Sequence, residues 1–179
     1  MHRLLLALLL SCSTVMAAEE AFPPSPIGEP EIKTLPAGTL LKASAPGRYF
    51  DQSGRLFGPL FRYISSNGIA MTTPVEAQIE QAAMYFWVAP SQEAKVTGNR
   101  GGVEVLAIPE RLVASLGARG GYTEENFAKA RARLEAWLHA QPQLEATGPA
   151  YGVFWNGPFT PGFIKRFEVH IPVRRIGGA

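Results

Sequence analysis

Two histidines, His139 and His170, follow the first seventeen residues and are the side chains best suited to act as a base or to bind a metal. Nucleophilic catalysis needs such a base beside a serine, cysteine or threonine, and neither histidine lies in a motif of that kind. Zinc-type sites need several histidine, cysteine or carboxylate ligands at short spacing, and the sequence has no such cluster. The sequence therefore predicts a protein that is not an enzyme.

The surroundings of the two histidines indicate different roles. His139 lies near the end of an expected helix, where a positive charge interacts favourably with the helix dipole. His170 lies in an expected strand, and by the two-residue period it points with Glu168 and away from Phe167 and Val169. We interpret His170 either as a hydrogen-bonded strand residue or as an axial ligand to iron.

An aromatic loop near the C-terminus indicates binding rather than catalysis. Phe159 and Phe163 are separated by Thr-Pro-Gly, and Lys165 and Arg166 follow shortly after them. A mobile apolar loop beside two cations suits a flat apolar ligand that carries carboxylates, as a porphyrin does. Ordinary packing of this loop against a hairpin is the alternative interpretation.

Composition excludes other classes of protein. The chain has 179 residues, of which 46% are hydrophobic and 18% charged, and its formal net charge is +2. This length suits one well-buried domain. The weak charge, without any basic run, argues against a nucleic-acid partner. We expect a monomer.

The N-terminus has the pattern of a secretory signal peptide over residues 1–17. A short positive region precedes a leucine-rich segment at Leu4–Leu10, and the small residues around Ala17 suit cleavage. The apolar segment is far shorter than the ~20 residues of a membrane-spanning helix. We therefore expect an exported bacterial protein, periplasmic or secreted. The alternative is a lipid anchor at Cys12, the only cysteine of the chain.

Composition also divides the rest of the chain. Residues 18–30 hold four prolines and little apolar periodicity, which is typical of an extended or disordered linker. The folded domain is expected over residues 31–173. Residues 174–179 read as a C-terminal tail.

Apolar periodicity predicts the same order of elements twice in this domain: two strands, a helix and two more strands. The first unit has strands at 31–35, 39–45, 75–79 and 84–89 and a helix at 55–65. The second has strands at 102–108, 111–118, 151–155 and 167–173 and a helix at 123–141. Short connections within each strand pair favour antiparallel pairing. The predicted fold class is α+β, with duplicated ββαββ units that form an antiparallel sheet or distorted β-barrel with two flanking helices.

The segment from Phe57 to Val75 resembles the signature of the SOUL heme-binding family. Residues 57–64 match its Phe-x-x-Leu-Phe-x-Tyr-Ile helix, and residues 69–75 match its Ile-x-Met-Thr-x-Pro-Val strand entry. Residues 31–37 and 157–169 are similar to the family's opening strand and C-terminal segment. The resemblance covers the whole expected domain and implies a duplicated unit of antiparallel strands and one helix that forms a distorted barrel.

The resemblance also implies a ligand and a site. Family members bind heme or other tetrapyrroles non-covalently in an apolar surface cleft beside the first helix. Carried over to this sequence, and with His170 as the candidate iron ligand, the binding residues would be Leu56, Leu60, Arg62, Tyr63, Phe159, Phe163, Lys165, Arg166 and His170. Arg62 and Tyr63 lie off the most apolar stripe of the expected helix, which favours them as ligand-facing residues. Phe167 departs from the family, which usually has asparagine there.

Two alternative functions remain open. The same fold occurs in bacterial effector-binding domains, so a binding module for a different small ligand is the second hypothesis. A hydrolase that uses the same cleft is the third.

Overall fold

The computed structural model describes residues 18–177, and the signal peptide predicted for residues 1–17 lies outside the described residues. The strands are β1 (Glu19–Glu20), β2 (Pro30–Leu35), β3 (Gly38–Ser44), β4 (Thr72–Thr73), β5 (Val75–Gln78), β6 (Ala83–Val88), β7 (Glu104–Ile108), β8 (Arg111–Arg119), β9 (Leu144–Ala146), β10 (Tyr151–Phe154) and β11 (Arg166–Arg175). The helices are α1 (Tyr49–Ser66) and α2 (Glu124–His139), with short 3-10 turns at η1 (Pro90–Lys95) and η2 (Gly162–Ile164).

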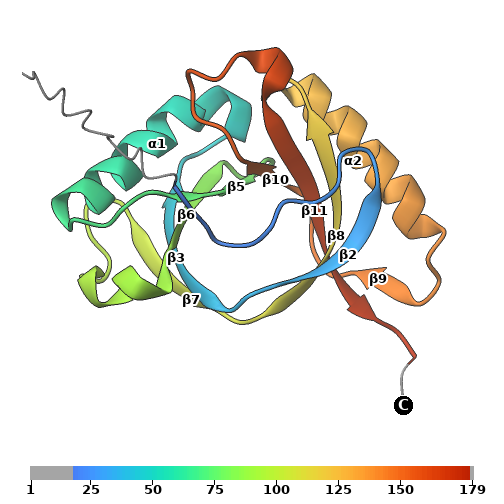
Figure 1. Ribbon diagram of the computed structural model, residues 1–179, viewed down its shortest axis with the longest axis horizontal. Coiled ribbons are helices and arrows are strands. Elements are labelled where there is room, and N and C mark those ends of the chain that lie inside the picture. Colours follow the sequence, from blue (N-terminus) through green and yellow to red (C-terminus); the bar gives the residue numbers. More distant parts are fainter. Residues whose placement is uncertain (1–17, 178–179) are drawn as a thin grey trace, which may run out of the picture.

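Eight strands form a curled antiparallel sheet in the order β2-β8-β11-β10-β5-β6-β3-β7. The sheet bends into a half-barrel, and α1 and α2 lie on its outer side (Figure 1). This arrangement confirms the predicted fold class. The short strand β9 pairs with the end of β11 through Arg174 and Arg175. The C-terminal tail was predicted to begin at residue 174. That predicted start is too early, because Arg174 and Arg175 still belong to the sheet.

The two repeats exchange their first strands. β2, which opens the first repeat, pairs with β8 of the second, and β7, which opens the second, pairs with β3 of the first. The expected pairing of β2 with β3 and of β7 with β8 is therefore wrong. A two-residue hairpin needs positive φ angles, and the connections Pro36-Ala37 and Pro109-Glu110 have none. The strands on the two sides of each connection pair with strands of different repeats instead of with each other.

Helix α1 is longer than the sequence predicted. It begins at Tyr49, six residues before the expected start at Arg55. The Ser53-Gly54 pair reads as a loop by composition, but burial of Tyr49 in the outer core overrides this local preference. Pro59 lies in the middle of the helix, and there it removes one backbone hydrogen bond. The hydroxyl of Thr123 caps α2 by accepting the Asn126 N–H at 3.2 Å.

Alternation along the strands divides the buried residues between two cores. Phe167, Val169 and Ile171 of β11 pack in the outer core beneath the helices. Glu168 and His170 point the other way, into the half-barrel, so the predicted orientation of His170 is confirmed. The inner core is smaller and consists of Phe22, Leu35, Leu40, Trp87, Val113, Tyr151, Val153 and Trp155. Across residues 18–177, neither helix is long and apolar enough to cross a membrane.

Candidate functional site

The N-terminal strap, residues 19–29, crosses the open side of the half-barrel (Figure 1). At its start β1 pairs in parallel with β4, and the Ala21 N–H donates to the Thr73 carbonyl at 2.7 Å. At its end Ile27 forms a bridge with Gly117, and the Gly28 N–H donates to the Gly117 carbonyl at 2.8 Å. Residues 18–30 were expected to be an extended or disordered linker before the folded domain, whereas the structure makes this segment part of the domain. The prolines do keep the segment extended, but it packs on the sheet.

Phe22 anchors the strap inside the half-barrel. Its side chain is 5% exposed, and its ring contacts Trp87 and Trp155 edge-to-face at centroid distances of 5.7 Å each. The His170 ring lies 6.0 Å away, and Lys33 Nζ stands 5.1 Å from the Phe22 centroid. Each aromatic pair of this kind contributes about 0.5–1.5 kcal/mol beyond area burial. Phe22 is therefore a main source of the strap's attachment.

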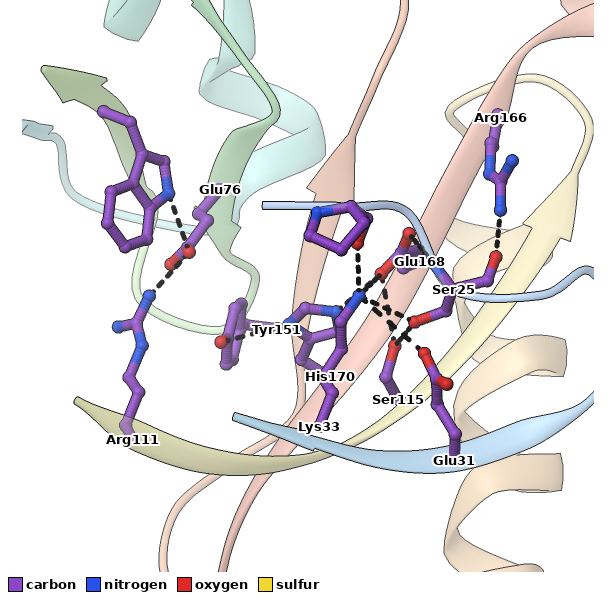
Figure 2. A network of polar contacts seen from close by, with 12 residues as sticks. Ser25, Glu31, Lys33, Glu76, Arg111, Ser115, Tyr151, Arg166, Glu168 and His170 are labelled. Carbon is purple, nitrogen blue, oxygen red and sulfur yellow. Dashed lines mark hydrogen bonds and ion pairs between the residues drawn. The ribbon is translucent and has the colours of Figure 1, made fainter. Parts of the chain in front are cut away.

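Glu168 is the centre of a buried polar network beneath the strap (Figure 2). Its carboxylate accepts hydrogen bonds from the Ser25 N–H (2.7 Å), His170 Nε2 (2.8 Å) and the Ser115 hydroxyl (3.2 Å), and Lys33 Nζ lies 3.4 Å away. Burial disfavours the charged carboxylate. The hydrogen bond from His170 and the positive charge of Lys33 outweigh burial, so the pKa of Glu168 is lowered. Glu168 is therefore ionised at neutral pH.

His170 has protein partners at both ring nitrogens. Nε2 contacts Glu168, and Nδ1 lies 3.2 Å from the Tyr151 hydroxyl. Burial lowers the pKa of His170 and raises the pKa of Tyr151, so at neutral pH the imidazole is neutral and the phenol keeps its proton. We assign the Tyr151 hydroxyl as donor to Nδ1 and the Nε2–H as donor to Glu168. Because no ring nitrogen is left for iron, the predicted axial-ligand role of His170 does not fit this geometry.

A second ion pair joins the buried Glu76 to Arg111, whose side chain is 27% exposed. The Arg111 guanidinium lies 2.6 Å from the Glu76 carboxylate, which also accepts the Trp87 indole N–H at 3.0 Å. The guanidinium stands over the rings of Trp87 (5.6 Å) and Tyr151 (5.8 Å). Arg111 Nε is buried without a protein partner. Glu76, Arg111 and Tyr151 line a cavity of about 160 Å³ at this end of the inner core.

The structure buries most of the residues that were expected beside the first helix. Leu56 and Leu60 are 1% and 0% exposed and pack in the outer core, so they do not line a surface cleft. Tyr63 was expected off the buried stripe, yet it is 4% exposed and its hydroxyl donates to a backbone carbonyl at 3.0 Å. Arg62 is exposed and, with Arg100, lines a cavity of about 210 Å³ beside α1.

The loop between β10 and β11 displays its aromatic side chains to solvent. Phe159 is 98% exposed, Phe163 80% and Ile164 46%. Packing of these rings against a hairpin, the alternative interpretation of the sequence, is therefore not what the structure shows. Lys165 Nζ stands 4.7 Å from the Tyr122 ring at the base of the loop.

Arg166 lies at the other side of that base and points away from the loop. Its guanidinium donates to the Ser25 carbonyl of the N-terminal strap (Figure 2). The sequence grouped Arg166 with Phe159 and Phe163. The structure instead joins it to the buried network, so it does not form a rim beside those rings.

Sequence reasoning missed the charged members of the inner core. Glu76 stands between Val75 and Ala77 in a strand that is largely buried on both faces, and a carboxylate there needs a partner. A carboxylate in such a strand was the feature of the sequence that could have indicated a buried ion pair. Arg111, the partner of Glu76, lies in β8, and Lys33, the partner of Glu168, lies in β2. These two strands pair because the repeats exchange their first strands, which the sequence did not reveal.

The buried network does not have the arrangement of a hydrolytic triad. The hydroxyls of Ser25 and Ser115 lie 2.6 Å from each other, and His170 contacts Glu168 and Tyr151 instead of either serine. Among residues 18–177, no three histidine, cysteine or acidic side chains gather in a way that could hold a metal ion. The network joins Ser25 of the strap to Lys33, Ser115 and Glu168 of the inner strands.

Solved structures share this fold. The C-terminal domain of EcmrR is similar with a TM-score of 0.64 and 14% identity, covering 83% of this chain and 98% of that domain. EcmrR in a complex with DNA gives a TM-score of 0.66 and 13% identity, and the match covers 83% of this chain but only 58% of the EcmrR chain. A hydrolase from Listeria innocua gives 0.58 and 11% identity, covering 84% of this chain and 94% of that chain. At such identities the similarity concerns the fold alone.

Sequence comparison identifies the family. No curated protein sequence matches the chain. The sequence pattern of the SOUL heme-binding proteins matches residues 25–172, which is most of the chain and includes the second half of the strap. The duplicated half-barrel with two outer helices agrees with the fold that the motif at residues 57–75 implied. The chain belongs to the SOUL heme-binding protein family.

Proposed function

We propose that this protein is an exported, non-catalytic binding protein for heme or a related tetrapyrrole, and that it holds the ligand on the loop between β10 and β11. Family membership supports tetrapyrrole binding. The observation that carries the site is the exposure of Phe159 and Phe163, at 98% and 80%. Large apolar side chains exposed together mark interaction surfaces.

The loop offers both kinds of contact that a tetrapyrrole needs. The faces of Phe159 and Phe163 suit the macrocycle, and two cations at the base of the loop suit its carboxylates. Lys165 is one of them, and its carbonyl accepts the Gly120 N–H at 3.0 Å. The other is Arg119, which precedes that glycine at the exposed end of β8. When bound, the heme iron supplies redox or gas-binding chemistry, and the protein residues bind and orient the macrocycle.

The position of the loop agrees with the family's cleft beside the first helix. The loop begins directly after Phe154, whose ring stacks on Tyr49 in the first turn of α1 at a centroid distance of 5.6 Å. The buried residues Leu56 and Leu60 then support the helix from below instead of touching the ligand. Export rests on the signal peptide predicted at residues 1–17, and a periplasmic or secreted location follows from it.

Titration of the purified protein with hemin tests the proposal. We expect a saturable Soret change at micromolar hemin, and at least tenfold weaker binding by the double variant Phe159→Ser/Phe163→Ser, which changes only exposed side chains. Ile176→Ser is the matched control, because Ile176 is 43% exposed but lies at the far end of β11. No Soret change in the wild-type protein would refute tetrapyrrole binding, and equal affinity of the double variant would refute the loop site.

A second candidate function is favoured by the unpartnered Arg111 Nε. A small ligand with a carboxylate or carbonyl oxygen could accept that N–H from the cavity of about 160 Å³ that Arg111 lines. The protein would then be a binding module of the effector-binding type. Calorimetry with benzoate tests this, and binding that survives Arg111→Met would exclude it.

A further inference from the structure

We propose that the concave side of the half-barrel is a binding site for an extended peptide with an aromatic anchor, and that the N-terminal strap fills it as a built-in, displaceable ligand. This inference goes beyond tetrapyrrole binding and uses different residues. It rests on the way in which the sheet contacts the main chain of the strap.

Side chains of the half-barrel form hydrogen bonds mainly with the backbone of the strap. The Glu168 carboxylate accepts the Ser25 N–H at 2.7 Å, and Arg166 donates to the Ser25 carbonyl. Lys33 Nζ donates to the Pro23 carbonyl at 2.8 Å. Strand-like pairing at both ends of the strap adds two further backbone hydrogen bonds. Peptide-binding sites obtain affinity from main-chain hydrogen bonds and specificity from side-chain pockets, and this site has both.

The side-chain pocket of the site receives Phe22. Trp87 and Trp155 contact the ring edge-to-face, and His170 closes a third side. An aromatic residue inserted into an enclosed pocket is the usual anchor of a protein–peptide contact. The strap therefore has the anatomy of a bound peptide, although it belongs to the same chain.

Charge in the site favours a neutral peptide. Glu168 is matched by Lys33 and Glu76 by Arg111, while His170 is neutral. The strap brings no charged side chain between residues 21 and 28. A charged anchor would remain unpaired in the buried site, which is costly. Prolines suit the strap because they favour an extended backbone and lack an N–H that would need a partner.

The strap can leave without opening the sheet. The strap crosses the strands and is not a strand of the eight-stranded sheet. Its own strand β1 has only two residues, and they pair with the two residues of β4. Segments held by few backbone hydrogen bonds open locally at lower free energy than core strands. Departure of the strap would expose Trp87 and Trp155 to an incoming peptide.

A peptide-binding experiment tests the proposal directly. The probe is a fluorescein-labelled peptide with the sequence of residues 19–29, followed by fluorescence polarisation. We expect the Phe22→Ala protein to bind it at least tenfold more tightly than the wild-type protein, whose intact strap competes at high effective concentration. The same peptide with Phe22 replaced by alanine should bind at least tenfold more weakly.

Two further variants control for the location of the peptide. A Cβ at Gly117 would stand 2.5 Å from the Pro26 carbonyl oxygen, so Phe22→Ala/Gly117→Ala should lose peptide binding. The matched variant Phe22→Ala/Gly148→Ala places its Cβ in ordinary contact, 3.5 Å from Pro172, and should keep it. Equal binding of both peptides, or binding that survives Gly117→Ala, would overturn the proposal.

Hydrogen exchange in the wild-type protein gives an independent test that does not depend on how well Phe22→Ala folds. The amides of Ala21, Ser25 and Gly28, which are hydrogen-bonded to the sheet, should exchange together through a local opening. They should exchange at least tenfold faster than protected amides in the paired strands β8 and β11. Exchange of the strap only at the rate of those strands would mean that it is a fixed part of the core, and the proposal would fail.

Discussion

Gly117 of β8 lies so close to Pro26 of the N-terminal strap that a Cβ at position 117 would stand 2.5 Å from the Pro26 carbonyl oxygen. The Ser25 carbonyl oxygen would lie 2.7 Å from the same Cβ. Gly117 has no left-handed φ angle, so close approach of a second backbone is what requires glycine here. The contact explains how the strap can lie flat on the sheet.

The first prediction concerns this contact. Gly117→Ala should lower the free energy of unfolding by about 2 kcal/mol, because the added methyl group meets backbone atoms that cannot move aside without detaching the strap. Urea denaturation followed by tryptophan fluorescence measures the change. Gly148→Ala, with its nearest contact at 3.5 Å, should stay within about 0.5 kcal/mol of wild type. Wild-type stability of Gly117→Ala would show that the strap adjusts at little cost.

The sequence was sufficient to predict the repeated elements and the fold class. Alternation in residues 167–173 correctly separated Glu168 and His170 from the residues beneath the helices, because a period of two is a local property of a strand. The exchange of β2 and β7 between the repeats was not predicted. It depends on the backbone at Pro36 and Pro109, and composition alone reads such short connections as hairpins.

The candidate site was predicted less well than the fold. The family resemblance implied that Leu56 and Leu60 line the site, and helical spacing alone could not tell which side of the helix meets the core. Phe22 was assigned to a linker because its neighbours are prolines. Its burial depends on the pocket between Trp87 and Trp155, residues 65 and more positions away, which no local pattern can indicate.

The second prediction is a two-step dependence of stability on pH. Burial lowers the pKa of His170 below 6.5 in the folded state, so the unfolded chain takes up a proton first as the pH falls below about 6.5. The folded-state pKa of Glu168 is about 2 against an ordinary value of 4.5. The ionised Glu168 carboxylate therefore contributes its full share of the folding stability above pH 4.5, and this contribution is lost as the pH falls towards 2. Stability should therefore decline in both windows.

Urea denaturation between pH 8 and pH 2 measures both windows. Each proton that only the unfolded state binds gives a slope of up to about 1.4 kcal/mol per pH unit. His170→Asn should remove the slope that begins near pH 6.5, and Glu168→Gln should reduce the one below pH 4.5, although both variants lose stability at neutral pH. A profile of His170→Asn parallel to wild type would contradict the assignment.

The third prediction is that the Glu76–Arg111 ion pair contributes more to stability than a surface ion pair does. Arg111→Met should cost about 3–5 kcal/mol, because it leaves the Glu76 carboxylate buried without its counter-charge. Adding Glu76→Gln should recover most of that loss, since a glutamine oxygen can still accept the Trp87 indole N–H, now 3.0 Å away. Arg174→Met breaks the exposed pair with Glu145 and should cost less than about 1 kcal/mol. A double variant as unstable as Arg111→Met alone would show that lost packing, not charge, is the cause.

The last prediction decides between two places for the carboxylates of a tetrapyrrole. Arg119 stands at the base of the aromatic loop, whereas Arg62 belongs to α1 and lines a cavity with Arg100. Both Arg119 and Arg62 are exposed. If the loop holds the ligand, Arg119→Glu should weaken hemin binding roughly fivefold to tenfold, equivalent to about 1.0–1.4 kcal/mol, and Arg62→Glu should have little effect. Soret titration with hemin dimethyl ester provides the control, because the ester lacks the two negative charges and should bind wild type and Arg119→Glu equally. The opposite ranking of the two variants would move the ligand to the cavity that Arg62 and Arg100 line and would contradict the loop site.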